Sequence, residues 1–404
     1  MYLALSWRNI WRNKKRTVIV AASVFFAVIL AALMRSGQLG SYAYMIHSSA
    51  RLFTGYVQIQ GQEYWEKRSL DESIVLDDAM IDQLNNIQHV TNYTTRLEAF
   101  ALISHQTTTR VAQVIGVDPT LENRTTGLRD NLIAGTYLSE NSNGLLIGSG
   151  MAELLKVGLG DSLVLYGQGF HGQIAAAILP ITGIIKLPFK QMNNTLIILS
   201  LEKAQEVFST GKRVTSIPVM IDNIRHLEQI SADIRSMLAA DQTLMTWDEM
   251  MPELKQNIEV DNVSGLIMLG ILYVVIAFGV FGTVMMMVSE RAREFAILVS
   301  VGMRKIRLLI VLVIETFLVS FIGVVAGIAA SIPLILYLIY NPIVLTGNMA
   351  EFYEKLNIEP IMPFSGEPSI FISQALVVLL IALVTLVYPV LFIRRLKPAE
   401  TIRG

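Results

Sequence analysis

The chain has 404 residues, of which 53% are hydrophobic and only 16% are charged, and its mean hydropathy is +0.51. This composition excludes a soluble globular protein of that length and indicates an integral membrane protein. The absence of cysteine excludes disulfides and cysteine-ligated metals, but it fits both oxidising and reducing compartments. The net charge of −1 hides an asymmetry, because residues 36–263 hold 16 Lys and Arg against 25 Asp and Glu, whereas the rest holds 16 against 8.

Residues 1–16 predict a cytosolic interfacial amphipathic helix, because they carry basic residues without one acid and apolar residues at helical spacing on another face. The basic residues are Arg8, Arg12, Lys14, Lys15 and Arg16, and the apolar ones are Leu3, Trp7, Ile10 and Trp11. Aromatic rings favour the headgroup level of a bilayer, and basic side chains favour anionic lipid.

An apolar stretch of 18 residues, 17–34, follows, and we expect the first transmembrane helix over residues 17–35. A cleavable secretory signal is the alternative, since basic residues precede the stretch. The apolar part of a signal usually has about 7–15 residues, and Arg35 follows here without a small-residue cleavage site. The pattern therefore favours an uncleaved span.

Residues 36–263 form the one large hydrophilic region, for which we predict an extracytoplasmic α+β domain with stalk-like ends. Alternating patterns predict strands at residues 56–60 and 195–199, whereas helical periodicity appears at residues 77–86 and 227–239.

Three further sequence patterns in this region predict local structure. Residues 146–165 have the pattern of a turn, a helix, a second turn and a strand. The glycine-rich residues 166–172 indicate either a projecting hairpin that contacts a partner or a plain turn. Met251, Leu254 and Ile258 recur at helical spacing, so a helix is expected to continue from the second span as a stalk.

The second span is expected over residues 264–288, since residues 265–288 contain no charge and about 20 apolar residues cross a bilayer. Residues 289–307 then hold five basic and two acidic residues with helical periodicity, and Gly302 is placed to end that helix. A short helix tethered to a span at both ends moves only when the spans move. It is therefore suited to receiving force from the cytosol.

The third span lies within residues 308–340, which is longer than a crossing needs, so we expect tilt, a kink at Pro333 or a protruding end to absorb the excess. Glu315 sits inside it and is a candidate functional residue, because an acid in hydrocarbon is costly unless it faces the bundle or water. Reaching towards the headgroups is the alternative. Gly323 and Gly327 form a small-residue face that allows close helix packing.

Residues 341–369 are rich in proline and acid, so we expect an extracytoplasmic loop there. Residues 370–393 contain no charge and predict the fourth span, and residues 394–404 are basic and predict a cytosolic tail. Basic segments favour the cytosolic side. Four spans put the N-terminus, residues 289–307 and the C-terminus together on that side.

The sequence carries no catalytic pattern that we could identify. There is no Walker A loop, since Gly211-Lys212-Arg213 lacks the upstream glycine and the hydroxyl residue. The five histidines show no metal-ligand spacing, and there is no G-x-S-x-G elbow. We therefore predict no catalytic residue, no metal site and no cofactor in this chain.

The run Glu290-Arg291-x-Arg293-Glu294-Phe295-Ala296-Ile297-Leu298-x-Ser300-Val301-Gly302-Met303 resembles the signature of the FtsX/MacB/LolC-LolE superfamily of ABC transporter permeases. Residues 146–165 resemble the periplasmic domain of the same superfamily. The resemblance implies that residues 289–307 form a coupling helix seated on a cytosolic ATPase. The residues expected at that contact are Glu290, Arg291, Arg293, Glu294, Ile297, Ser300, Gly302 and Met303.

The resemblance also implies a bacterial inner-membrane permease that works with a cytosolic ABC ATPase dimer, which binds ATP and magnesium, and with a second permease. No nucleic acid is expected as a partner. The lipoprotein-release branch is most similar, through Trp7-Arg8-Asn9-Ile10 and Gly55-Tyr56-Val57-Gln58-Ile59, and it implies a periplasmic carrier or adaptor. Export of a drug, peptide or other amphiphile and control of a cell-wall hydrolase are alternatives. A membrane-anchored sensor is a different class that would need no ATPase.

Overall fold

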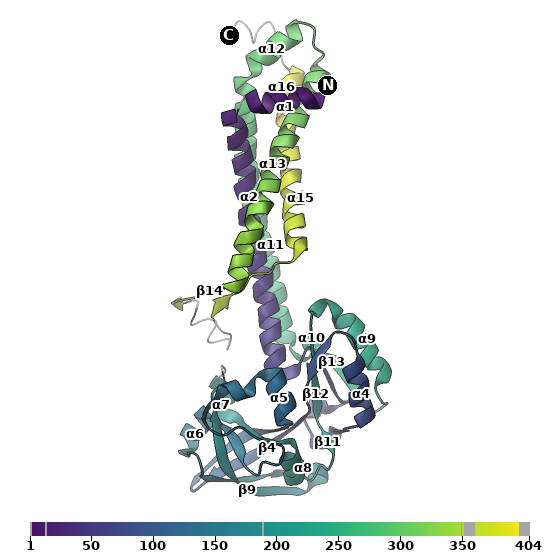
Figure 1. Cartoon of the computed structure of the whole chain (residues 1–404), viewed down its shortest axis with the longest axis vertical. Coiled ribbons are helices and arrows are strands. Elements are labelled where there is room, and N and C mark those ends of the chain that lie inside the picture. The colour runs from purple at the N-terminus through teal and green to yellow at the C-terminus, as the bar shows by residue number, and fades with distance from the viewer. Residues whose placement is uncertain (1, 13, 188–189, 349, 351–359, 396–404) are drawn as a thin grey trace. The chain divides into compact units, whose positions relative to one another are not determined.

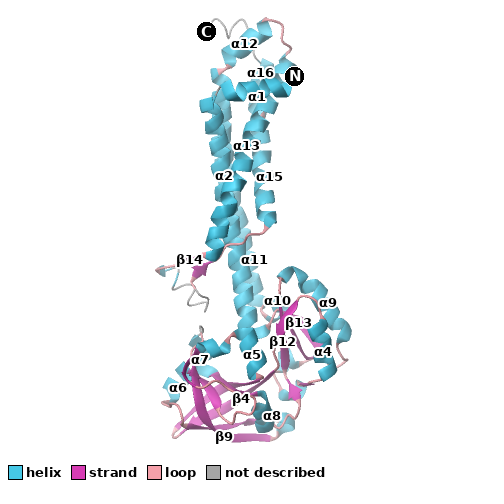
Figure 2. Ribbon diagram, viewed as in Figure 1, coloured by secondary structure: helices cyan, strands magenta, loops and turns pink. Residues whose placement is uncertain are grey.

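The computed structural model describes residues 2–12, 14–187, 190–348, 350 and 360–395. It divides into two compact units, shown by position along the chain in Figure 1 and by secondary structure in Figure 2. The helical unit comprises Met1–Ala43, Asn257–Leu345 and Ile361–Gly404, and the α+β unit comprises Tyr44–Gln256 and Thr346–Pro360. The predicted class, four apolar helices with a large α+β domain between the first two, is confirmed.

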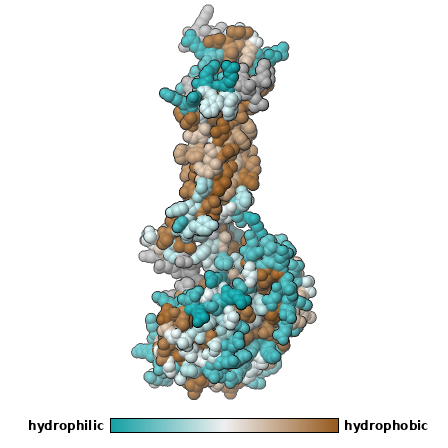
Figure 3. Space-filling model, in the orientation of Figure 1, coloured by the Kyte–Doolittle hydropathy of each residue, from teal (hydrophilic) through white to brown (hydrophobic). Residues whose placement is uncertain are grey.

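Four stretches of helix are long and apolar enough to cross a membrane, by length and composition. They are α2 (Lys14–Ser49), α11 (Pro252–Glu290), α13 (Lys305–Tyr340), and α15 (Pro368–Thr385) with α16 (Val387–Arg395). Among the described residues of this unit, the short helices are α1 (Tyr2–Arg12) and α12 (Ala292–Ser300), and β14 (Ile343–Val344) pairs with β15 (Ile361–Met362). Figure 3 shows hydrophobic side chains over the visible face of the long helices.

The long helices extend beyond the predicted spans. α2 continues past residue 35 to Ser49, and α11 starts at Pro252 rather than at residue 264. Proline is tolerated in the first turn of a helix, where its missing N–H has no partner to lose. Residues 351–359 and 396–404, within the predicted loop and tail, lie outside the described residues.

α13 is the best-packed of the four helices. In its most apolar window 56% of residues are buried, compared with 11% in α11. A Cβ added at Gly323 would lie 2.7 Å from the Ala21 carbonyl oxygen, and one at Gly327 would lie 2.9 Å from Val28 Cβ. These glycines therefore let α13 approach α2 more closely than larger residues would allow.

One lobe of the α+β unit is a four-stranded antiparallel sheet in the order β13-β1-β12-β3, packed with two helices (Figure 2). Its elements are β1 (Val57–Gly61), α4 (Asp78–Asn86), β3 (Val90–Tyr93), β12 (Ser216–Ile221), α9 (Leu227–Met237) and β13 (Gln242–Thr246). This is the split βαβ arrangement, with a long insertion between β3 and β12. Its helices bury Leu84, Ile230 and Ile234 completely.

The insertion forms a closed ring of six strands, in which each strand pairs with two neighbours in the order β4-β5-β10-β7-β9-β8 and back to β4. Their bounds are β4 (Arg96–His105), β5 (Thr108–Val117), β7 (Leu145–Gly148), β8 (Ser162–Gln168), β9 (Ile174–Ile185) and β10 (Leu196–Ser200). Closure leaves no free strand edge within the ring. Alternate residues fill the interior: Leu97 and Ile103 are buried, whereas Phe100 and Leu102 face out.

The remaining elements of the α+β unit cover the ends and edges of these two lobes. The helices are α3 (Tyr64–Lys67), α5 (Pro119–Thr126), α6 (Ser149–Leu155), α7 (Lys190–Thr195), α8 (Leu201–Phe208) and α10 (Trp247–Met250). The strands are β2 (Ile74–Val75), β6 (Leu132–Gly135) and β11 (Arg213–Val214).

The local expectations for this unit are met with one exception. The predicted strands at residues 56–60 and 195–199 correspond to β1 and β10, and the predicted helices to α4 and α9. Residues 166–168 belong to β8, and the residues after them lead through a turn to β9, which pairs with β8 as a hairpin; contact of this hairpin with a partner stays a prediction. The turn expected before α6 is wrong: β7 occupies that place, because its four residues are buried between β10 and β9.

Candidate functional site

The coupling segment, residues 289–307, contains a helix of its own between two apolar helices. α11 ends at Glu290, and Arg291 has φ −97° and ψ 5°, so the backbone leaves the helical conformation for one residue before α12 begins. The Phe295 N–H donates to the Arg291 carbonyl at 3.0 Å, which starts the new helix. Figure 1 shows α12 as a separate helix beyond the end of α11.

α12 ends at the glycine that the sequence marks. Gly302 has φ +103°, a conformation that side chains disfavour. Its N–H donates to the Val299 carbonyl at 3.1 Å, and the Met303 N–H donates to the Leu298 carbonyl at 3.0 Å. These two bonds form a Schellman cap, so both ends of α12 are fixed by the local sequence.

One face of α12 packs into the helical unit. Phe295 is 2% exposed and Ala296 is fully buried, in a core cluster that includes residues of α2, α11 and α13. Burial of a phenylalanine side chain contributes about 2–3 kcal/mol relative to exposure. α12 is therefore held against the bundle rather than lying free as a loop.

A buried ion pair joins the coupling segment to α13. Arg291 Nη1 donates to Glu315 Oε1 at 2.8 Å, and the two side chains are 5% and 4% exposed. The Arg291 guanidinium also lies 5.1 Å from the centre of the Phe295 ring. Because removing one partner of a buried pair strands the other charge, the pair makes the orientation of Arg291 costly to change.

The structure shows where the Glu315 side chain lies, while its functional role stays a prediction. Its side chain faces the interior of the bundle, 3% exposed as a residue, rather than reaching towards lipid headgroups. Sequence reasoning missed its partner, since Arg291 was expected on the outer surface.

The opposite face of α12 is open. The predicted contact residues that are exposed are Glu290, Arg293, Glu294, Ile297, Ser300 and Gly302. Met303 is half-buried against the helical core. Ile297, Leu298 and Val301 are also exposed, by 48%, 42% and 83%. The exposed surface thus combines charges with apolar side chains, as protein-binding surfaces do.

α1 meets the coupling segment through Glu294. Arg12 Nη2 and Arg291 Nε each lie 3.4 Å from Glu294 Oε2. α1 is also anchored to α13, because buried Ser6 donates to the Val311 carbonyl at 3.1 Å. Arg12, Glu294, Arg291 and Glu315 therefore form one chain of ion pairs from the exposed helix α1 to the buried face of α13.

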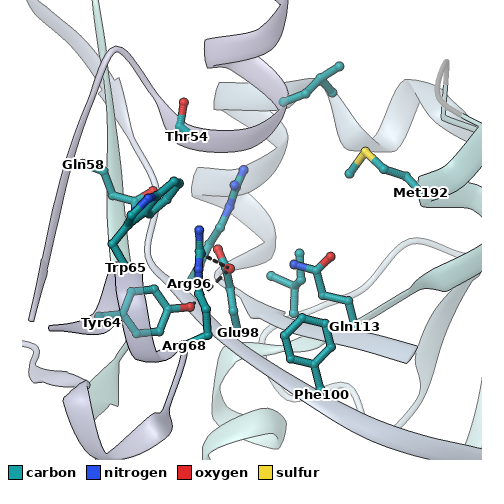
Figure 4. A pocket seen from close by; sticks show the side chains of 12 residues that line it. Thr54, Gln58, Tyr64, Trp65, Arg68, Arg96, Glu98, Phe100, Gln113 and Met192 are labelled. Carbon is teal, nitrogen blue, oxygen red and sulfur yellow. Dashed lines mark hydrogen bonds and ion pairs between the residues drawn. The ribbon is translucent and has the colours of Figure 1, made fainter. Parts of the chain in front are cut away.

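A second candidate site is a cavity of ≈ 370 Å³ between the two lobes of the α+β unit. Figure 4 shows Tyr64 and Trp65 on one side of the cavity, and Phe100, Gln113 and Met192 on the other. Its lining residues are Leu52, Thr54, Gln58, Tyr64, Trp65, Arg68, Arg96, Glu98, Phe100, Gln113, Ile115 and Met192.

Two of the three charged residues that line this cavity, Arg68 and Glu98, lie close to each other, whereas Arg96 pairs with Glu122 outside the lining. The Tyr64 hydroxyl donates to Glu98 at 3.3 Å, and Arg68 Nη1 lies 3.8 Å from the same carboxylate. The Arg68 guanidinium stacks on Trp65 at 3.8 Å from the ring centre. Burial and the neighbouring Glu98 raise the pKa of the Tyr64 phenol, which keeps it neutral. The cavity therefore presents an aromatic wall and a charge-balanced wall.

The sequence matches two family models that together touch both units. A MacB-like periplasmic core domain matches residues 17–237, and an FtsX-like permease C-terminal domain matches residues 266–398. The chain is 21% identical over 305 residues to the lipoprotein-releasing system transmembrane protein LolC of Xylella fastidiosa, covering 72% of this chain and 73% of that protein. It is 20% identical over 266 residues to the LolC of Neisseria meningitidis serogroup B, covering 63% and 62%.

Two solved structures each align with about half of the chain. The extracellular domain of the noncanonic ABC-type transporter YknZ from Gram-positive bacteria aligns with 47% of this chain and 99% of its own, at 12% identity and a TM-score of 0.35. The periplasmic region of MacB from Actinobacillus actinomycetemcomitans aligns with 50% and 92%, at 16% identity and a TM-score of 0.34.

Proposed function

Because this chain belongs to the FtsX/MacB/LolC family of ABC transporter permeases, we propose that its coupling segment receives force from a cytosolic ABC ATPase dimer. ATP and magnesium are bound by that partner. The observation that carries the proposal is the two-sided character of α12. Its outer face offers Arg293, Glu294 and Ile297 to a partner, while its inner face is fixed to the bundle through Phe295 and the Arg291–Glu315 pair.

In this mechanism Arg291 is a positioning residue and not an ATPase contact, since its side chain is 5% exposed. A push on α12 passes through the ion pair to α13 and through the chain itself to α11. α11 and α2 contain the points at which the chain passes between the helical unit and the α+β unit. They are the stalks that deliver the motion to the periplasmic α+β unit.

The orientation follows from the charges. Exposed basic residues lie within the coupling segment and within and directly after α1, and such residues favour the cytosolic side of a membrane. Both termini and the coupling segment are then cytosolic, and the α+β unit is periplasmic, in the inner membrane of a bacterium.

A second permease would complete the bundle along α11. Only 11% of its apolar window is buried within this chain, and Phe278 and Val275 are 73% and 63% exposed. A Cβ added at Gly270, Gly279 or Gly282 would meet nothing within 4 Å. α11 therefore has room for close approach by a helix of an identical or related permease.

The cargo we propose is lipoprotein, extracted from the inner membrane and passed to a periplasmic carrier. The support is the sequence likeness to proteins named as lipoprotein-releasing LolC subunits, at 20–21% identity. Export of a drug, peptide or other amphiphile, in the manner of MacB, is the second candidate, because a MacB-like domain model covers residues 17–237.

The test is a charge swap on the outer face of α12. The double variant Arg293→Glu with Glu294→Arg keeps the net charge but reverses the pattern offered to the ATPase. In proteoliposomes with the ATPase, we expect ATP hydrolysis to lose its coupling to lipoprotein release while insertion of the chain is unchanged. Release measured as transfer of labelled lipoprotein to a soluble carrier gives the readout.

The matched control swaps an exposed pair in the α+β unit, Glu63→Lys with Lys67→Glu, and should leave coupling intact. Normal coupling in the α12 swap would refute the assignment of that face. If the wild-type complex instead couples ATP hydrolysis only to export of an amphiphile, the permease mechanism stands and the lipoprotein cargo is wrong. A chain that never associates with an ATPase would support the sensor class.

A further inference from the structure

Two histidines that are far apart in the sequence lie together on the split βαβ lobe. His89 directly precedes β3, and Asp222 directly follows β12, which is the antiparallel neighbour of β3. The Asp222 N–H donates to the His89 carbonyl at 3.1 Å, so strand pairing sets the two residues opposite each other. A short 3₁₀ turn, Ile224–His226, then brings His226 back to the same place.

The ring nitrogens of both histidines converge on one carboxylate. His89 Nδ1 lies 2.8 Å from Asp222 Oδ2, and His226 Nδ1 lies 2.9 Å from Asp222 Oδ1. The two rings are stacked, with centroids 3.7 Å apart and an interplanar angle of 25°. One potential ligand atom from each residue lies within 4.8 Å of the other two.

The backbone holds this arrangement in place. His89 has φ +72°, a left-handed conformation that is uncommon for residues other than glycine. Two hydrogen bonds hold the backbone around His89. The His89 carbonyl accepts from the Asp222 N–H, and the Val90 N–H donates to the Ile87 carbonyl. The imidazole is thus presented by two paired segments and not by a free loop.

We propose that His89, Asp222 and His226 bind a divalent transition-metal ion, of which zinc is the best match. Two imidazoles and one carboxylate are ligands that zinc and its first-row neighbours prefer. Zinc bonds of about 2.1 Å in a tetrahedral site place neighbouring ligand atoms about 3.4 Å apart, so the nitrogen–oxygen distances of 2.8 and 2.9 Å would each lengthen by about 0.5 Å when the ion enters. Calcium and magnesium require more oxygen ligands than this cluster supplies.

The ion remains reachable from solvent. The side chains of His89, Asp222 and His226 are 26%, 41% and 33% exposed, so water can complete the coordination shell. A bound ion ties the start of β3 to the end of β12 and to the turn that leads into α9. The role of the ion is to stabilise this lobe. The metal-site proposal does not depend on which cargo the permease moves.

The test measures metal binding by the full-length chain in detergent, purified through a tag that contains no histidine. Zinc affinity is obtained by competition with a chromophoric chelator, and cobalt is used as a spectroscopic probe. We expect one zinc per chain, a cobalt absorption band of nitrogen and oxygen ligation, and a higher melting temperature with zinc. Calcium and magnesium should produce neither the stoichiometry nor the shift.

Three variants remove one ligand each: His89→Asn, Asp222→Asn and His226→Gln. Asparagine is chosen at position 89 because it tolerates a left-handed backbone. Each should weaken zinc binding about 100-fold or more, since even loss of a group supporting a metal ligand costs about 10–100-fold. The melting temperature without metal reports whether each variant is folded.

The matched control is His171→Gln. His171 also lies near an aspartate, with its Nδ1 3.5 Å from Asp71 Oδ1. Among the described residues, however, this pair is not part of a group of three potential metal ligands. This variant should keep wild-type zinc affinity. Zinc binding that is unchanged in folded His89→Asn and His226→Gln chains, or wild-type binding weaker than that of calcium, would overturn the proposal.

Discussion

Each unit contains a buried pair of arginine and glutamate, and the two pairs are held very differently. In the α+β unit, Arg96 donates to Glu122 through both Nε and Nη2, at 3.0 and 2.8 Å, and Thr94 donates to the same carboxylate at 2.9 Å. In the helical unit, one bond of 2.8 Å joins Arg291 to Glu315. Both pairs are at least 94% buried at the side chain.

The difference shows two uses of a buried charge. The Arg96–Glu122 pair is bidentate and joins the start of β4 to α5, so several fixed groups would have to break together. The Arg291–Glu315 pair depends on one bond, and its arginine lies at the break between α11 and α12. The Arg96–Glu122 pair therefore fixes β4 rigidly to α5. The Arg291–Glu315 pair is suited to a flexible connection that transmits motion.

The largest effect on stability is expected from breaking the Arg96–Glu122 pair. Arg96→Met leaves Glu122 buried without its guanidinium, which should lower the free energy of unfolding of the α+β unit by about 3–5 kcal/mol. The change is measured by unfolding the purified chain in urea and monitoring the α+β unit by its sensitivity to a protease. The double variant Arg96→Met with Glu122→Leu should recover most of the loss. A loss below about 1 kcal/mol in the single variant would show that Glu122 is not held by Arg96.

Breaking the Arg291–Glu315 pair should reduce stability less than breaking the Arg96–Glu122 pair does, but it should impair coupling more. Glu315→Gln keeps the size of the side chain and an oxygen that accepts from Arg291, so the guanidinium retains one partner and the loss of stability should lie below the cost of about 3–5 kcal/mol for breaking a buried pair outright. We expect normal insertion and ATPase association, with loss of coupling between ATP hydrolysis and cargo release. Ser320→Ala, one turn beyond in α13 and buried without a described partner, is the control. Full coupling in Glu315→Gln would contradict the role of the pair.

The smallest effect is expected at the exposed end of the same ion-pair chain. Arg12 and Glu294 are 64% and 52% exposed at the side chain, and such pairs contribute about 0–1 kcal/mol. Arg12→Ala should change the melting temperature of the chain little and leave coupling close to wild type. A loss as large as that in Glu315→Gln would mean that α1 takes part in force transfer.

The helices and their ends were largely readable from local sequence. Charge-free stretches of 24 residues define the second and fourth spans, and an 18-residue apolar stretch defines the first. Gly302 marks the end of α12, since only glycine adopts its backbone conformation easily. The strands β1 and β10 followed from alternation. The buried strand β7 did not, because a strand covered on both faces loses the alternation that reveals it.

Local sequence determined that this protein has four apolar helices, a charged helix between the second and third, and an α+β domain after the first. Only the tertiary structure decided that β8 closes the ring onto β4, that Arg291 turns inward to Glu315, and that His89 meets His226 across Asp222. Periodicity and capping depend on residues three or four positions apart, so a sequence displays them directly. Pairing across a bundle or a sheet depends on which distant segments become neighbours, and that is settled by packing of the whole chain.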